Sequence, residues 1–309
     1  MALLFVPLTG AFQQAAGSGL STLGENLDRP HWSGAELSGL DSLRDVWGAV
    51  SEAEFHDWIL GVRHPLYIKE GPAPCRFLDR DPAERKLALD IATTAAEAAH
   101  HLGARYIVFP FPFPGPVGAG AEGGAHQPPD AGGPDGLADW TEEAVYEASR
   151  QAFAHLAELQ ERERIQIALE LSGLTRHFLD GDILSRLFGE FPDLSLCIDT
   201  GRLGLLARSW GQDPLELTKR WLPWTRYLHL HTSLWEEDGS YRDRIPTNGT
   251  HSTALWPRVT PAADIARLVT EAQPRCSVVL WHDPRAVTAG ELEEAHRWAA
   301  AMAVRKEAG

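Results

Sequence analysis

Three side chains that can bind metal ions or move protons stand at the ends of successive apolar segments. Glu170 lies near the end of IQIALEL, Asp199 ends LSLCID, and His229 lies in RYLHLH. Apolar segments of this length predict strands that are buried on both faces. An ionised carboxylate there is unfavourable unless it is paired or bound to a cation. Because carboxylates and imidazoles bind Mn, Co, Mg and Zn ions, these residues are candidate ligands of one divalent metal.

Other predicted strand ends carry side chains that could contact a substrate beside such a metal. His231 lies two residues after His229, so both imidazoles share one face of their strand. We therefore take His231, with Glu170, as a candidate catalytic group that transfers protons. The candidate substrate-binding residues are Glu36, His64, Arg202, Trp281 and His282.

Structural interpretations of the same residues are also open. His231 could be a hydrogen-bonded core histidine, and Glu36 could cap a turn or pair with Arg63. Glu170 is harder to explain in this way, because no basic residue occupies the five positions after it. Its partner must therefore come from another strand or be a metal ion.

Arg202 gives the segment LCIDTGR two opposite interpretations. A guanidinium group does not ligate metals, but it binds carboxylates and phosphates with two parallel hydrogen bonds, which would suit an anionic substrate. It could equally pair with Asp199 and replace the metal. The first interpretation predicts an ion at Asp199, and the second predicts a short contact between the two side chains.

The apolar segments alternate with helical ones along nearly the whole chain. Eight strands, each followed by a helix, in 309 residues predict a single-domain (β/α)8 barrel over residues 1–309. An open doubly wound sheet is the competing arrangement, but no GxGxxG motif follows an early strand. In a barrel, the carboxyl ends of the strands form one mouth, where functional residues lie. The predicted strands span residues 3–7, 33–39, 57–64, 105–110, 165–171, 194–199, 226–231 and 277–282.

Capping residues predict where several helices begin. Asp81 and Asp213 each precede a proline at the first helical position and a glutamate at the third, and Thr260 precedes a proline in a similar way. The helix after Asp81 is expected to end at Gly103. The first helix is expected within residues 11–30, where the Gly-rich sequence marks it weakly.

Residues 115–138 do not fit the repeat of strands and helices. Half of these 24 residues are glycine or proline, so the segment cannot form a packed element. It follows the fourth strand and therefore leaves the mouth of the predicted barrel. It is either a flexible insertion within the domain or a mobile lid over the site.

Composition limits the partners and the location. The net charge of -15 argues against nucleic acid, because that affinity comes largely from Lys and Arg on phosphates. Three scattered cysteines without a CxxC motif suit a reducing compartment. The apolar start MALLFVPLTG has no basic residue and contains a proline, and no segment is long enough to span a membrane. We expect a soluble, cytoplasmic protein that does not bind membranes.

Four short motifs, in this order and spacing, resemble the xylose isomerase-like TIM-barrel superfamily. They are ALELSG at 168–173, LCIDTGR at 196–202, YLHLHTS at 227–233 and RIPTNG at 244–249, and HHLGARYIVFPFP resembles a further segment. That superfamily includes ketose 3-epimerases, inosose dehydratases and isomerases, and endonuclease IV-type DNA repair enzymes. The resemblance covers nearly the whole chain and implies the same barrel.

The resemblance also implies a metal site. The sugar epimerases and isomerases hold one metal with Glu, Asp, His and Glu on strands five to eight, and Glu170, Asp199 and His229 match the first three. Trp281 stands where the fourth ligand is expected, with His282 next. The two glutamates form the acid/base pair in the epimerases, so the loss of one argues against two-base epimerisation. Arg202 replaces a histidine of the family motif.

The endonuclease IV-type activity fits less well. Its three-metal cluster needs a histidine at the end of strand four, where this chain has Phe109 and Pro110. It needs a second histidine where Arg202 stands, and a D-x-H motif of which only Asp243 is kept. Together with the acidic net charge, these differences argue against DNA repair.

Two hypotheses follow. The first is a metal-dependent enzyme of the isomerase, epimerase or dehydratase type that acts on a small sugar, polyol or hydroxy-carbonyl substrate and forms the homodimers common in the superfamily. One divalent ion (Mn, Co, Mg or Zn) would assist proton transfer by Glu170 and His231. The second is a catalytically degenerate barrel that binds a small anion or a protein partner without metal.

Overall fold

The computed structural model describes residues 2–9, 32–66, 75–112, 137, 139–171, 176–237, 240–282 and 289–304. The predicted first helix, within residues 11–30, lies outside the described residues. So does the Gly/Pro-rich segment 115–138, apart from Leu137. Whether that segment is an insertion or a lid therefore stays a prediction.

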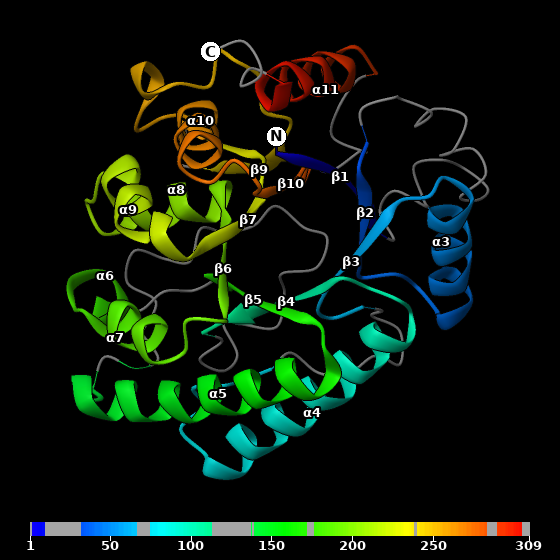
Figure 1. Ribbon diagram of the computed structural model, residues 1–309. Coiled ribbons are helices and arrows are strands. Elements are labelled where there is room, and N and C mark those ends of the chain that lie inside the picture. Colours follow the sequence, from blue (N-terminus) through cyan, green and yellow to red (C-terminus); the bar gives the residue numbers. More distant parts are fainter. Residues whose placement is uncertain are drawn as a thin grey trace.

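Eight parallel strands close into a barrel, in the order β1-β10-β7-β6-β5-β4-β3-β2 (Figure 1). Helices surround the ring of strands, so the predicted (β/α)8 barrel is confirmed. The barrel strands are β1 (Leu3–Thr9), β2 (Gly34–Ser38), β3 (Ile59–Arg63), β4 (Tyr106–Phe111), β5 (Gln166–Leu171), β6 (Ser195–Asp199), β7 (Thr225–His229) and β10 (Ser277–Val279).

The last two barrel strands end earlier than the sequence predicts. β7 ends at His229 because the chain then enters a hairpin of β8 (Thr232–Trp235) and β9 (Tyr241–Ile245), which the sequence did not reveal. β10 ends at Val279, although the backbone N–H of Trp281 still donates to the Leu230 carbonyl at 3.0 Å. His231 and His282 thus follow their strands instead of ending them.

The described helices cover the outside of the barrel (Figure 1). Asp81 and Asp213 cap their helices as predicted, and Gly103 ends the first of these with a positive φ of 74°. Thr260 does not cap a helix, because that helix begins after Pro261 without a side-chain cap. The helices are α3 (Leu43–Phe55), α4 (Pro82–His101), α5 (Glu142–Glu163), α6 (Arg176–Asp180), α7 (Ile183–Glu190), α8 (Thr200–Ser209), α9 (Pro214–Trp221), α10 (Ala262–Ala272) and α11 (Ala289–Val304). None of the described helices is long and apolar enough to cross a membrane.

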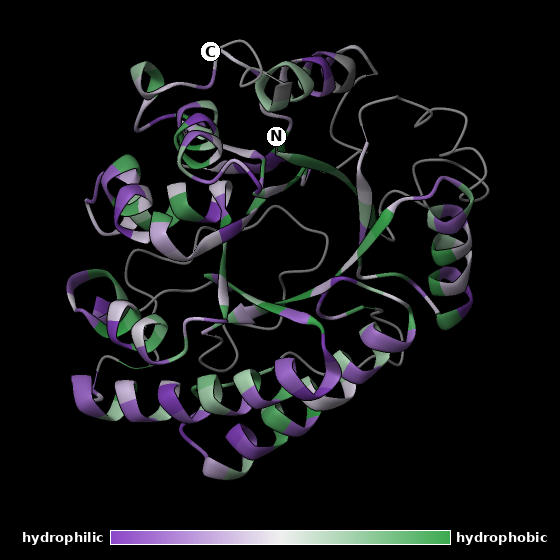
Figure 2. Cartoon of the chain, in the orientation of Figure 1, coloured by the Kyte–Doolittle hydropathy of each residue, from purple (hydrophilic) through white to green (hydrophobic). Residues whose placement is uncertain are grey.

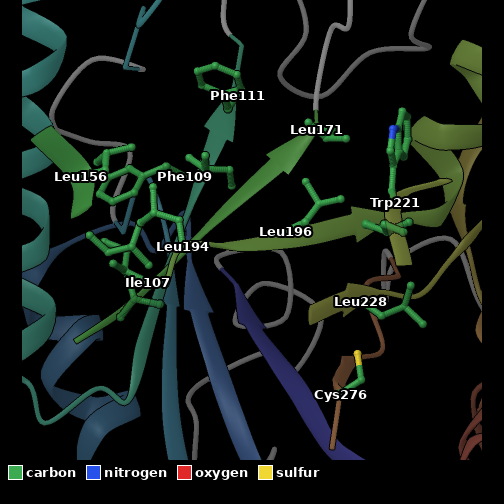
Figure 3. Close-up of a cluster of buried hydrophobic side chains, with 14 of the residues drawn as sticks. Ile107, Phe109, Phe111, Leu156, Leu171, Leu194, Leu196, Trp221, Leu228 and Cys276 are labelled. Atoms are coloured by element: carbon green, nitrogen blue, oxygen red, sulfur yellow. The ribbon is translucent and has the colours of Figure 1, made fainter. Parts of the chain in front are cut away.

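One apolar layer lies between the strands and the helices. Hydrophobic residues follow the strands in Figure 2, and Figure 3 shows Phe109, Phe111 and Leu196 pointing away from the barrel axis. Phe111 packs edge-on against Phe153 of α5 and Phe178 of α6. Alternation along β4 explains this, since its odd-numbered residues face the helices.

A second, smaller apolar group fills the inside of the barrel. Two glycines make room for its largest rings: a Cβ at Gly34 would lie 2.6 Å from the Phe5 ring, and one at Gly61 would lie 2.2 Å from the Tyr106 ring. Because this apolar group fills the middle of the barrel, the polar residues that face inward lie at the carboxyl ends of the strands. It consists of Phe5, Tyr106, Val108, Ala168, Cys197, Tyr227, Val279 and Trp281.

Candidate functional site

The structure brings together the three residues that the sequence singles out as metal ligands. β5, β6 and β7 are neighbours, and the register pairs Asp199 with His229 across β6 and β7. One donor atom from each of Glu170, Asp199 and His229 lies within 4.8 Å of those of the other two. All three side chains are buried at the mouth end of the barrel.

Arg63, the last residue of β3, pairs with Glu170 inside the barrel. Its Nε lies 2.6 Å from Oε2 and its Nη2 lies 2.9 Å from Oε1, so the guanidinium binds both carboxylate oxygens. Arg63 thus pairs with Glu170, whereas one of the open interpretations of the sequence paired it with Glu36. Glu36 is in register with Gly61, two residues before Arg63, so the guanidinium reaches further towards the mouth.

This pairing fixes the charges of both groups. Burial alone would raise the pKa of Glu170, but the charge and hydrogen bonds of Arg63, with a hydrogen bond from His229, hold it well below its usual range. Burial alone would lower the pKa of Arg63, but the charge of Glu170 raises it above its ordinary value. Glu170 is therefore an ionised carboxylate and Arg63 a guanidinium cation.

His229 lies between two carboxylates. Its Nδ1 is 2.9 Å from Glu170 Oε2, and its Nε2 is 3.0 Å from Glu36 Oε1, at an angle unsuited to a hydrogen bond. The ring stacks on Trp281 with centroids 4.9 Å apart. Burial alone would lower the pKa of His229, but the acidic groups around it, Cys197, Glu36 and Glu170, raise it well above its ordinary value.

Glu36 enters the group from β2, where its neighbours in the strand, Ala35 and Leu37, belong to the outer core. The Tyr106 hydroxyl donates to Glu36 Oε2 at 2.9 Å, so Oε1 is left facing His229. Glu36, a candidate substrate-binding residue in the sequence, thus lies against His229, one of the candidate metal ligands.

His231 forms a second charged group beside the first. Its Nε2 lies 2.7 Å from Asp199 Oδ1 and its Nδ1 lies 3.2 Å from Asp243 Oδ1, while Ser233 donates to the same Asp243 oxygen at 2.7 Å. Burial alone would lower the pKa of His231, but the two carboxylates raise it to about 9. Gly201 makes this placement possible, because a Cβ there would lie 2.1 Å from His231 Cε1.

Asp199 is not held mainly by the Arg202 side chain. Its Oδ1 accepts the Arg202 backbone N–H at 2.9 Å as the cap of α8, whereas the Arg202 Nε is 3.9 Å from Oδ2. The same Nε lies 3.6 Å from Glu170 Oε1. The short side-chain contact expected for a simple Asp199–Arg202 pair is therefore missing, and the guanidinium lies over both carboxylates at the mouth.

A third guanidinium comes from the hairpin. Arg244, on β9, has a positive φ of 54°, and its guanidinium carbon is 6.0 Å from the centre of the Trp281 ring. The Arg63 guanidinium lies 5.3 Å from the centre of the same ring. Trp281 is nearly fully buried, and its ring contacts His229 as well as these two cations.

Two predicted site residues face the outer layer. His64 follows the inward-facing Arg63, and its ring lies 5.6 Å from that of Phe109. His282 follows Trp281, and its ring lies 5.9 Å from that of His296 on α11. The structure thus does not bring these imidazoles together with Glu170, because alternation turns each one away from the barrel axis.

Four residues of the site were missed by sequence reasoning about function. Tyr106 gave no signal, because a tyrosine in an apolar segment is ordinary core. Arg63 stood at a predicted strand end and could have been included. Asp243 and Arg244 precede or begin the motif RIPTNG, but nothing in the sequence predicts that a hairpin folds them back onto the barrel.

The donors fit one divalent ion in number and type. Two carboxylates and one imidazole suit Mn, Co, Mg or Zn, and each carboxylate oxygen has two lone pairs, so Glu170 can serve Arg63 and a metal together. His229 Nε2 and Glu36 Oε1 lie 3.0 Å apart without a hydrogen bond inside the described part of the chain, so both could ligate a metal once His229 has lost its proton. Trp281 supplies none from β10.

A family model described as "Xylose isomerase-like TIM barrel" matches residues 21–301. No curated protein matches the sequence. Among solved structures, the IolI protein with a bound zinc atom is 14% identical, with a TM-score of 0.63 over 98% of both chains.

Two further structures show the same similarity. A D-tagatose 3-epimerase-like protein is 13% identical, with a TM-score of 0.61 over 97% of this chain and 96% of its own. Mannonate dehydratase from Streptococcus suis is also 13% identical, with a TM-score of 0.61 over 98% of this chain and 94% of its own. At such identities, these structures establish a shared fold and nothing finer.

Proposed function

Because the chain belongs to the xylose isomerase-like TIM-barrel family, we propose that it is a metal-dependent enzyme of the isomerase, epimerase or dehydratase type. Its substrate would be a small sugar, polyol or hydroxy-carbonyl compound. Mannonate dehydratase, among the similar structures, catalyses a reaction of this kind, as its name states, and another of them is described as D-tagatose 3-epimerase-like. The observation that carries the proposal is the buried convergence of Glu170, Asp199 and His229 at one mouth.

The proposed ligands are Glu170, Asp199 and His229, with Glu36 beside them. A divalent ion bound there would polarise a carbonyl or hydroxyl group of the substrate. The chain's own residues would then move the proton. Glu170 is the carboxylate that would accept a proton, although its low pKa makes it a weak base in the metal-free protein. His231, whose pKa is raised to about 9, holds a proton that it can donate.

The site offers one carboxylate base near the substrate position and no second one from β10. Val279 and Trp281 face the barrel interior there, and no carboxylate follows among the residues described up to His282. Epimerisation by two bases needs a second proton-transfer group on the opposite face of the substrate. We therefore expect one-base isomerisation or dehydration in preference to two-base epimerisation.

A second candidate is a barrel that binds a small anion or a protein without metal. It is favoured by the Arg63 guanidinium, which already neutralises Glu170 through two hydrogen bonds. In that case Arg63 would be the permanent counterion of Glu170, and the cluster would be a buried ion-pair network. The two candidates differ in one measurable property, which is metal content.

The test is elemental mass spectrometry on protein purified without chelator or affinity-tag metal. We expect about one equivalent of a divalent ion, lost in Glu170→Gln and Asp199→Asn but kept in Glu216→Gln, which alters an exposed residue of α9. A screen of ketoses, inososes and sugar acids with the loaded protein then tests turnover. Absence of metal even after incubation with each ion would refute the enzyme proposal and leave the second candidate.

A further inference from the structure

Three guanidinium groups surround the candidate metal ligands, yet only one of them is fully used. Arg63 gives two hydrogen bonds to Glu170. The other two, on Arg202 and Arg244, come from α8 and β9, which follow β6 and β7 at the mouth. Such a concentration of positive charge is unusual in a chain with a net charge of -15.

Arg244 has no acidic partner within ion-pair distance among the described residues. Its neighbour Asp243 is held by His231 and Ser233 instead. The Arg244 side chain is partly buried, and its guanidinium lies over the face of Trp281. A desolvated guanidinium without a counterion is unfavourable, and a bound anion would remove that penalty.

Arg202 also has hydrogen-bond donors to spare. Its Nε lies 3.6 Å from Glu170 and 3.9 Å from Asp199, which is beyond a normal hydrogen bond in both cases. Its side chain is 39% exposed, so a ligand entering the mouth can reach it. A guanidinium fork suits a planar or tetrahedral oxyanion, which it binds through two hydrogen bonds.

Shared contacts place the three groups close together, since Arg202 and Arg63 both lie beside Glu170 Oε1, and Arg63 and Arg244 both lie over the Trp281 ring. Burial lowers the pKa of Arg244, and the positive charges of Arg63 and Arg202 lower it further, against a smaller opposite effect of Asp243 and Asp199. Like charges are held together in this way only at a cost in stability, which an anionic ligand offsets. Glu36, Glu170, Asp199 and Asp243 are the acids nearby, and each already has a partner at short range.

We propose that the substrate carries an oxyanion, a carboxylate or a phosphate, which Arg202 and Arg244 bind at the mouth of the barrel. This inference rests on the proposed function of the same site and names its substrate class: a hydroxy acid or a phosphorylated polyol rather than a neutral sugar. The reacting carbon would then lie between the two arginines and Glu170.

Calorimetric titration of the protein with D-gluconate, inorganic phosphate and neutral D-sorbitol tests this directly. We expect at least one anion to bind about 10-fold to 100-fold more tightly than sorbitol, as charged hydrogen bonds imply. Whichever anion binds more tightly identifies the group as carboxylate or phosphate. Sorbitol binding as tightly as both anions, or neither anion binding, would overturn the inference.

Arginine variants test where the anion binds. Arg244→Gln and Arg202→Gln should each reduce anion affinity to the level of sorbitol, whereas Arg242→Gln, an exposed arginine of the same strand paired with Glu236, should not. Thermal unfolding of each variant checks the fold, and unchanged affinity in both folded site variants would contradict the inference. Titrations with and without metal separate the two proposals. If the protein binds an anion but neither binds metal nor turns over a substrate, only the proposed enzymatic function is refuted. If it binds metal and turns over neutral sugars, only the proposed anionic substrate is refuted.

Discussion

Replacing Arg63 by methionine should destabilise the folded chain strongly. The variant removes two hydrogen bonds of 2.6 and 2.9 Å and leaves the Glu170 carboxylate, which has no exposed surface, without its principal counterion. Breaking a buried pair in this way costs about 3–5 kcal/mol, because one charge stays buried and unpaired. Urea denaturation of metal-free protein, followed by circular dichroism, measures the loss.

Arg150→Met provides the matched control. Arg150 pairs with Glu190 at 2.6 Å, but both side chains are substantially exposed, so its removal should have far less effect. The double variant Arg63→Met/Glu170→Met should recover most of the stability, because no charge then stays buried. If Arg63→Met were no more destabilising than Arg150→Met, Glu170 would be solvated or neutral, and our view of the cluster would be wrong.

Two further predictions concern His231. In metal-free protein, the charged imidazole of His231 should stabilise the fold fully below pH 6.5, and this stabilisation should be lost as the pH rises through its pKa of about 9, a change of about 3 kcal/mol. Denaturation of the parent protein and of His231→Gln across this range measures the effect, because the variant should lack this pH dependence. If the free energy of unfolding changed with pH equally in both proteins, the pairing of His231 with Asp199 and Asp243 would be contradicted. Gly201→Ala should push the imidazole away from Asp199 and lower the free energy of unfolding by about 1–3 kcal/mol. Gly189→Ala, whose Cβ would meet open space, is the control, and equal stabilities would refute this reasoning.

The positions of the barrel strands could be predicted because each is a short apolar segment between helix signals. Glu170 and Asp199 were found for the same reason: a carboxylate at the end of an apolar segment has few structural explanations. The motifs around Glu170 and Asp199 also resemble the family, which supported the choice of the same two residues. At two strand ends, alternation decides which of two consecutive residues faces inward. The sequence analysis chose His64 where Arg63 faces inward, and it named both Trp281 and His282 where only Trp281 does.

Partners across the barrel could not be predicted. Arg63 and Glu170 are 107 residues apart, and only the closure of the barrel brings them within hydrogen-bond distance. The hairpin of β8 and β9 was missed because its strands are short and polar on one side, with no alternation long enough to detect. That hairpin delivers Asp243 and Arg244, so of the cations at the mouth only Arg202 could be related to an anionic substrate from the sequence.

The arginines repel the divalent cation that the proposed metal ligands would bind, and an anionic substrate would reduce this repulsion. A divalent cation held by Glu170 and Asp199 would be repelled by guanidinium groups that lie only a few ångströms from the same carboxylates. An oxyanion bound by Arg202 and Arg244 would cancel part of that repulsion, so metal and substrate would strengthen each other's binding. In the absence of metal and substrate, the ion pair between Arg63 and Glu170 would then neutralise part of the charge in the cluster and so stabilise the fold.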